Sequence, residues 1–443
     1  MNEVRIPSGS SAILDKVEGD LLLASGATVE AKDPHGLEVS GTIHCEGNCV
    51  FNSSVSSFSL RGRGGEITVR GDLHVKSSIR VERGSLTVEG GLTAKDIRVE
   101  LELHIGKDLD SSNVKSGKRL RIGGNARADE IEVGGALEAL GDVNAESLEV
   151  GGSVRVEGSI VGSLMDVGEY LYGKGPIKVD RIRVGGKLKT EGEVISEDLD
   201  VGGTAEIAGG DIKGRIKVGG TFKSSKPLNF GSMDVGGRVS LTGGCRGDRI
   251  SVGGILHVNG DIKFGEIDVG GSISIAGDAE GEEIDVGGRL KVDGCLKLSG
   301  NLDVGGRAEV EGRVETRSID VGGSLKGLRV VASDSVDVGG SISTIEGTKA
   351  ERVRIGRKGE IHGPVVAGEV NLEEGAEAED IYAEVLIMEE GSSAKNIYAK
   401  KIYLERCCRV LGETQYVEEL RSEKDVHFAT EPKKISSLPP TPI

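Results

Sequence analysis

The chain contains no tryptophan, and aromatic residues make up only 3% of its 443 residues. Large aromatic side chains usually fill a broad globular core, so their scarcity favours a narrow interior packed with small aliphatic residues. No apolar run is long enough to span a bilayer, and the start of the chain, Met1 to Arg5, lacks a basic segment followed by an apolar one. We therefore expect a cytoplasmic protein, without a membrane as partner.

Basic residues and cysteines are also too few for two classes of function. The net charge of −17 argues against nonspecific binding of nucleic acid, which needs a basic surface. Six cysteines do not make a disulfide framework in a chain of this length. Cys45, Cys49 and the adjacent His44 could be three metal ligands by type, but no fourth ligand is evident. A structural role is the alternative, and we predict it also for Cys245, Cys407 and Cys408.

One phrase, Ile/Leu-Asp-Val-Gly-Gly, recurs between Ile131 and Ile355 with a step of 17 residues. Its second hydrophobic residue occupies Val133, Val150, Val167, Val184, Val201, Val218, Val235, Val252, Val269, Val286 and, after one step of 18, Val304, Val321, Val338 and Ile355. Such a period is typical of a solenoid, in which each repeat buries its apolar face only against its neighbours.

Within each repeat the apolar residues come in pairs spaced by two, which is the period of a strand. One repeat places Ile267, Val269, Ile273, Ile275 and Ala279 at these positions. Glycines at fixed offsets separate the pairs, and we interpret them as corners at positive φ. Three short strands and three corners per repeat predict an all-β fold, a three-sided parallel β-helix. Connections between parallel strands favour a right-handed winding.

The strength of the repeat divides the chain. We expect an N-terminal arm or cap over residues 1–20, a β-helix rod over 21–411 that is most regular over 131–355, and a capping segment with a disordered proline-containing tail over 412–443. Ile122 and Val133 are only 11 residues apart, so we also predict an irregularity over 123–130. The extra residue of the single 18-residue step should lie between Lys297 and Asn301, in a corner.

The outward position after the first apolar residue of the phrase is often acidic, namely Asp200, Asp234, Asp268, Asp285, Asp303, Asp320 and Asp337. Stacked at the spacing between strands, these carboxylates should repel one another. Two interpretations stand beside each other. Each carboxylate could accept a hydrogen bond from the N–H of the glycine two residues on, or the column could hold divalent cations.

Histidines do not recur at one offset, so no catalytic group is assembled by the repeat. They are His35, His44, His74, His104, His257, His362 and His427. The equivalents of His257 one repeat away are Ser240 and Ser274. The glycine-rich matches are corners of strands and open no helix, so none is a phosphate-binding loop. We predict no catalytic, cofactor-binding or metal-binding residues, no cofactor, and no enzymatic activity.

Residues 60–410 resemble the bactofilins, the polymer-forming cytoskeletal proteins of prokaryotes. The resemblance rests on corners such as Ile267-Asp268-Val269-Gly270-Gly271, on the second-corner glycine exemplified by Gly277, and on the short repeats without aromatic residues. It implies a right-handed three-sided β-helix that polymerises end to end into filaments without nucleotide, as a scaffold for cell shape or for protein cargo. The alternative is a β-helical binding platform, or a subunit of a larger complex, that does not polymerise.

Overall fold

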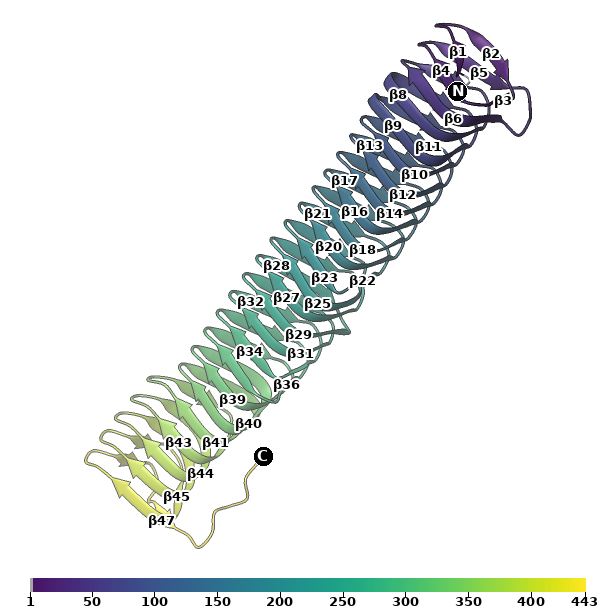
Figure 1. Cartoon of the computed structure of the whole chain (residues 1–443). Helices are drawn as coiled ribbons and strands as arrows, with labels where there is room; N and C mark the ends of the chain where they lie inside the picture. The colour runs from purple at the N-terminus through teal and green to yellow at the C-terminus, as the bar shows by residue number, and fades with distance from the viewer. Residues whose placement is uncertain (1–2) are drawn as a thin grey trace. The chain divides into compact units, whose positions relative to one another are not determined.

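The computed structural model describes residues 3–443, and this part of the chain folds into parallel β-strands without a helix. The architecture is a β-solenoid of about 25 turns, with a spacing of about 17 residues. The chain divides into two compact units, unit 1 (Met1–Gly220) and unit 2 (Thr221–Ile443). Figure 1 shows the strands of each unit stacked turn upon turn. The predicted all-β solenoid is confirmed.

The described strands of unit 1 are β1 (Glu3–Ile6), β2 (Ser11–Leu14), β3 (Lys16–Val17), β4 (Asp20–Leu23), β5 (Ala27–Ala31), β6 (Leu37–Glu46), β7 (Cys49–Phe51), β8 (Val55–Val69), β9 (Leu73–Val88), β10 (Leu92–Val99), β11 (Glu102–Ile105), β12 (Leu109–Ser116), β13 (Arg119–Ile122), β14 (Ala126–Val133), β15 (Ala136–Ala139), β16 (Val143–Val150), β17 (Ser153–Val156), β18 (Ile160–Val167), β19 (Tyr170–Gly173), β20 (Ile177–Val184), β21 (Lys187–Thr190), β22 (Val194–Ser196), β23 (Asp198–Val201), β24 (Thr204–Ile207) and β25 (Gly210–Val218).

Those of unit 2 are β26 (Thr221–Ser224), β27 (Leu228–Val235), β28 (Arg238–Thr242), β29 (Cys245–Val252), β30 (Ile255–Asn259), β31 (Ile262–Val269), β32 (Ser272–Ile275), β33 (Ala279–Gly281), β34 (Glu283–Val286), β35 (Arg289–Val292), β36 (Leu296–Leu298), β37 (Asn301–Val304), β38 (Arg307–Val310), β39 (Arg313–Val321), β40 (Ser324–Val338), β41 (Ser341–Ile355), β42 (Glu360–His362), β43 (Val365–Leu372), β44 (Glu377–Met388), β45 (Ser393–Leu404), β46 (Arg409–Val410), β47 (Thr414–Ser422), β48 (His427–Phe428) and β49 (Lys433–Lys434).

One turn has three sides, and each side pairs with its equivalent one turn later. β17 pairs with β19 in register, and β18 pairs with β20 around the bend between its two halves. Where that bend interrupts the strand, the two sides appear separately, as β22 and β23 do against β20. Three sides per turn are therefore present, as predicted, while the hand of the winding stays a prediction.

The core is the interior of the turns. The predicted inward residues Ile267, Val269, Ile273, Ile275 and Ala279 are all at most 1% exposed. Their neighbours one repeat away occupy the same positions, since Val252 pairs with Val269 and Val269 with Val286. Strand alternation explains why a period of two within a turn and 17 between turns keeps these side chains inside.

The predicted irregularity over 123–130 is wrong. Ile122 pairs with Ala139, and Ser116 pairs with Val133, both at a step of 17. Ile122 and Val133 belong to different sides of the turn, so the 11 residues between them are an ordinary offset. Sequence reasoning missed this because Ser116 stands at a core position that usually carries valine or isoleucine. The 18-residue step is confirmed, because its extra residue lies between Leu298 and Leu302.

Both ends of the solenoid extend beyond the predicted limits of 21 and 411. β1, β2 and β3 pair with β4, β5 and β6, so residues expected to form an arm or cap are a turn of the solenoid. At the other end, β47 and β48 continue the stack onto β45 and β46. The tail runs back beside unit 2 (Figure 1), and a Cβ added at Gly347 would lie 2.8 Å from Cδ1 of Ile443. The expected disordered tail is therefore placed against the solenoid.

Glycines at the main corner are needed for a different reason from the one predicted. Gly270 and Gly271 are not at positive φ, although Gly260 at the second corner is, with φ of 122°. A Cβ added at Gly271 would come within 2.3 Å of the carbonyl oxygen of Gly254, one turn earlier. The corners stack so closely that only glycine fits between them, which is a constraint of distance and not of backbone angle.

Candidate functional site

The stacked outward side chains are the most regular surface features of the protein. In unit 2, Asp268, Asp285, Asp303, Asp320 and Asp337 pair in register from turn to turn, and we call this column the acidic ladder. The two other predicted members do not belong to it. In unit 1, Asp200 lies beside Arg183 and Lys217, and in unit 2 Asp234 lies beside Ser251.

The carboxylates of the acidic ladder do not cap the glycines that follow them. The N–H of Gly270 donates to the carbonyl oxygen of Val252 at 3.1 Å, and the N–H of Gly287 donates to that of Val269 at 3.1 Å. The predicted hydrogen bond within each phrase is therefore wrong, since ladder bonds between turns already use these donors.

Asp303, at the centre of the acidic ladder, has a raised pKa. Burial raises the pKa of the Asp303 carboxyl above its ordinary value, and the charges of Asp320 and Asp285 raise it further. Among the described residues no group of three or more His, Cys, Asp or Glu side chains is arranged to hold a metal ion. The column thus offers exposed negative charge without the converging ligands that a divalent cation needs.

A second column, which sequence reasoning missed, does cap backbone groups. In unit 1 the N–H of Asn125 donates to Oδ1 of Asp108 at 2.7 Å, that of Asp142 to Oδ1 of Asn125 at 2.9 Å, and that of Ser159 to Oδ1 of Asp142 at 2.7 Å. The hydrogen bonds from Ser159 hold the pKa of Asp142 below its ordinary value. The signal was an Asp or Asn at the second corner, which follows a glycine at Asn125 and Asp142 but Lys107 at Asp108.

A third column carries positive charge in unit 1. Arg61, Arg80, Arg98 and Lys115 pair in register on successive turns, and we call them the basic ladder. All four are exposed. Sequence reasoning missed the column because the repeat positions were counted from the recurring Ile/Leu-Asp-Val-Gly-Gly phrase, which starts only at Ile131. The basic ladder occupies the same offset of the repeat as the acidic ladder.

Of the three candidate metal ligands near the start of unit 1, the two cysteines meet and the histidine does not join them. Cys45 and Cys49 are buried in the core, at 2% and 0% exposure, and a hydrogen bond between their thiols together with burial raises the pKa of Cys45. His44 points the opposite way, because it precedes Cys45 in β6 and successive side chains of a strand alternate. Cys245 and Cys408 are also buried, in agreement with their predicted structural role, whereas Cys407 is exposed.

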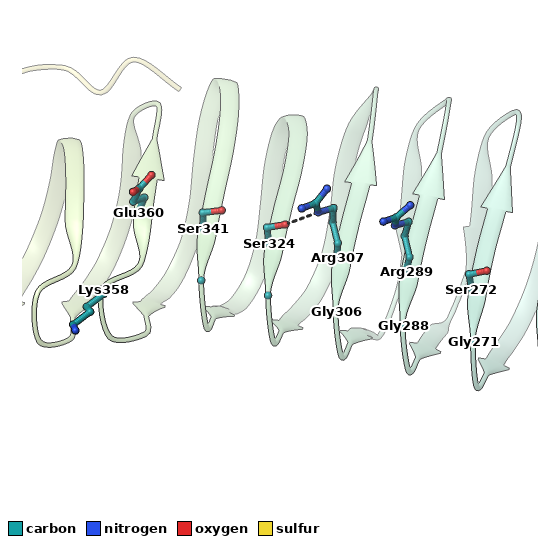
Figure 2. Close-up of a pocket in the computed structure, with 12 residues that line it drawn as sticks. Gly271, Ser272, Gly288, Arg289, Gly306, Arg307, Ser324, Ser341, Lys358 and Glu360 are labelled. Atoms are coloured by element: carbon teal, nitrogen blue, oxygen red, sulfur yellow. Dashed lines mark hydrogen bonds between the residues drawn. The ribbon is translucent and has the colours of Figure 1, made fainter.

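A shallow groove of about 880 Å³ follows the glycine corners of unit 2. Figure 2 shows Ser272, Arg289, Arg307, Ser324 and Ser341 side by side along it. Nε of Arg307 donates to Oγ of Ser324 at 3.1 Å, and Arg289 has no ion pair within the described residues. The groove holds no pairing of a nucleophile with a base. His257, on the same side of the turns as Ser272, lies between Ser240 and Ser274 as predicted.

Comparisons with family models, with curated proteins and with solved structures gave no match. Within residues 3–443, no helix has the length and apolar character that crossing a membrane requires.

Proposed function

We propose that this protein is a non-enzymatic, cytoplasmic structural protein that associates end to end into filaments and serves as a scaffold, as the resemblance to the bactofilins implies. The supporting observation is the incomplete burial of core positions in the end turns. Val4 and Leu14 point inward in the first described turn, yet both are only half-buried. Leu21, which occupies the position of Val4 one turn later, is 0% exposed.

Inward side chains of the last turns are also incompletely buried. Leu420 and Phe428 occupy inward positions of β47 and β48 but remain half-buried, whereas their partners Ile402 and Val410 are 0% exposed. Among the described residues β48 pairs on one side only, and the outer edge of β47 meets β49 only at Gln415 and Tyr416, so the rest of that edge has no strand partner. Adding another end would complete the same hydrogen bonds and burial that join two turns within a unit, so association needs no nucleotide.

Substituting an inward residue of an end turn tests this proposal. Leu14→Lys places a charge in the surface that association would bury, whereas Ile13→Lys changes an outward side chain that is 68% exposed in the same strand. Negative-stain microscopy and light scattering should show filaments for the wild type and for Ile13→Lys, and single particles for Leu14→Lys.

The dependence of association on salt concentration distinguishes end-to-end association from contacts between charged surfaces. Filaments held by apolar ends and backbone hydrogen bonds should persist at 1 M salt, where the Debye length is about 3 Å. Monomers of the wild type at every concentration and salt would contradict the proposal. The protein would then be better described as a binding platform, for which the groove in Figure 2 is the first surface to probe.

A further inference from the structure

The basic ladder is a concentrated positive surface in a chain with a net charge of −17. Its four cations stand on consecutive turns of one sheet face, so they repeat at the strand spacing of about 4.8 Å. His44 continues the column on the turn before Arg61. The positions two residues before the cations carry short residues, such as Ser78 next to Arg80 and Asn113 next to Lys115, whereas Glu82 lies on the other flank of Arg80.

Two of the four cations of the basic ladder have an acidic partner within their own unit, and two have none. Arg80 pairs with Glu82 at 2.9 Å and Lys115 pairs with Glu132, both on the surface. Arg61 and Arg98 form no ion pair within residues 3–443. Exposed pairs of this kind contribute little to stability, so all four side chains can turn to another partner at small cost.

The acidic ladder presents the complementary surface. Only Asp337 has a cationic partner among the described residues, Arg354 at 3.3 Å. Burial raises the pKa of Asp303, and repulsion by the stacked charges of Asp320 and Asp285 raises it further. A row of cations placed opposite would relieve this repulsion. Five acidic positions at the strand spacing can accept four basic positions with the same spacing, turn for turn.

We propose that two copies of this chain associate side by side, with the basic ladder of unit 1 in one copy against the acidic ladder of unit 2 in the other. A second copy of the chain fits as the partner for two reasons. Its ladder has the opposite charge, and its charged side chains repeat at the same strand spacing. Each copy offers one ladder of each sign, so the contact can also continue to further copies. It does not depend on the end turns, and thus not on the proposed filaments.

A charge-swap experiment tests the pairing in the full chain, with Leu14→Lys added so that association through the end is blocked. Arg61→Glu with Arg98→Glu should weaken self-association at 50 mM salt by roughly ten-fold or more, since two attractive contacts become repulsive. Asp285→Lys with Asp303→Lys should do the same. The chain that carries all four changes should recover the association, because attraction is restored with the signs reversed.

The matched control replaces Lys95 and Arg127 by Glu, which changes the net charge of unit 1 equally at exposed cations outside the ladder. Sedimentation velocity should show dimers or larger species for the control and for the four-residue swap at 50 mM salt. These should dissociate at 500 mM salt, where screening is strong. Melting temperatures close to that of the parent chain confirm that each variant is folded.

Three results would overturn the proposal. They are a parent chain that stays monomeric at 50 mM salt, a control that loses association as strongly as the ladder variants, and a four-residue swap that fails to recover it. Binding of a labelled oligonucleotide through Arg61 and Arg98, without self-association, would instead assign the basic ladder to nucleic acid. Loss of filaments in Leu14→Lys leaves the ladder pairing untouched, so the two proposals fail separately.

Discussion

Each inward side chain touches the side chains at the same position of the turns before and after it, so a single substitution is felt on both sides. Val269, at 0% exposure, lies between Val252 and Val286. Ser274, only five residues away, points outward between His257 and Lys291. Position within the turn, and not position along the chain, therefore decides what a residue tolerates.

Val269→Asp should lower stability by several kcal/mol, because an unpaired carboxylate would replace a methyl-bearing side chain in the dry interior. Ser274→Asp should be nearly silent. Thermal unfolding followed by circular dichroism, with hydrogen exchange to locate the loss, checks the pair. Equal destabilisation by both substitutions would contradict the assignment of inward and outward positions.

Close stacking at the corners makes a second prediction at this scale. Gly271→Ala should cost more than about 1 kcal/mol, because the new Cβ would meet a backbone oxygen that cannot move aside. Gly391 has φ of 70° and open space around it, so Gly391→Asn should cost less, since Asn tolerates that conformation. Melting temperatures of the two variants check this prediction. A smaller decrease for Gly271→Ala than for Gly391→Asn would contradict close stacking of the corners.

At the level of the strands and corners, hydrogen bonds between side chains and the next turn hold the second corner in place. Asp142 accepts both the N–H and the hydroxyl of Ser159, at 2.7 and 2.8 Å. Asn125 performs the same task one turn earlier with an amide oxygen. A charge is therefore not required for the cap, only an acceptor at that point.

The pH dependence of Asp142 follows from its lowered pKa. Because the folded state holds the carboxyl ionised, the contribution to stability is present above the ordinary pKa and is lost as pH falls through the lowered one. Asp142→Ala should thus lower the melting temperature at pH 7, with a difference that shrinks in acid. Asp142→Asn, whose amide oxygen accepts the same bonds without titrating, should match the wild type at pH 7 and melt above it in acid, and a pH-independent loss in the alanine variant would contradict the cap.

For the whole molecule, stability comes from neighbouring turns, so complete turns can be removed without changing the remaining contacts. Deleting residues 270–286 joins Val269 directly to Gly287 and restores the same phrase one turn shorter. The shortened protein should fold with similar spectra and a slightly lower melting temperature.

A deletion of nine residues, 270–278, is the matched control. It removes only part of a turn, so the sides that follow would meet the wrong partners and the outward residues would face the core. Circular dichroism and limited proteolysis should show local unfolding in this variant alone. Equal tolerance of both deletions would show that the 17-residue register is not what holds the unit together.

The fold class, the period and the inward positions of the regular repeats could be predicted from the amino-acid sequence alone. These follow from local physics, since alternation of apolar residues at a step of two and glycine at fixed offsets leave a parallel solenoid as the solution that buries every repeat. The role of Cys245 as a core residue and the extra residue before Leu302 followed from the same phase.

The features that depend on pairing between turns emerge only in the folded chain. Ser116 at a core position disguised a regular step, and the end turns carry weaker versions of the repeat, so their register became visible only through their partners. The reason for the corner glycines lies in a contact with the previous turn. The basic and acidic ladders likewise exist only once residues 17 or 18 apart are stacked, because side chains distant along the chain become neighbours on one face.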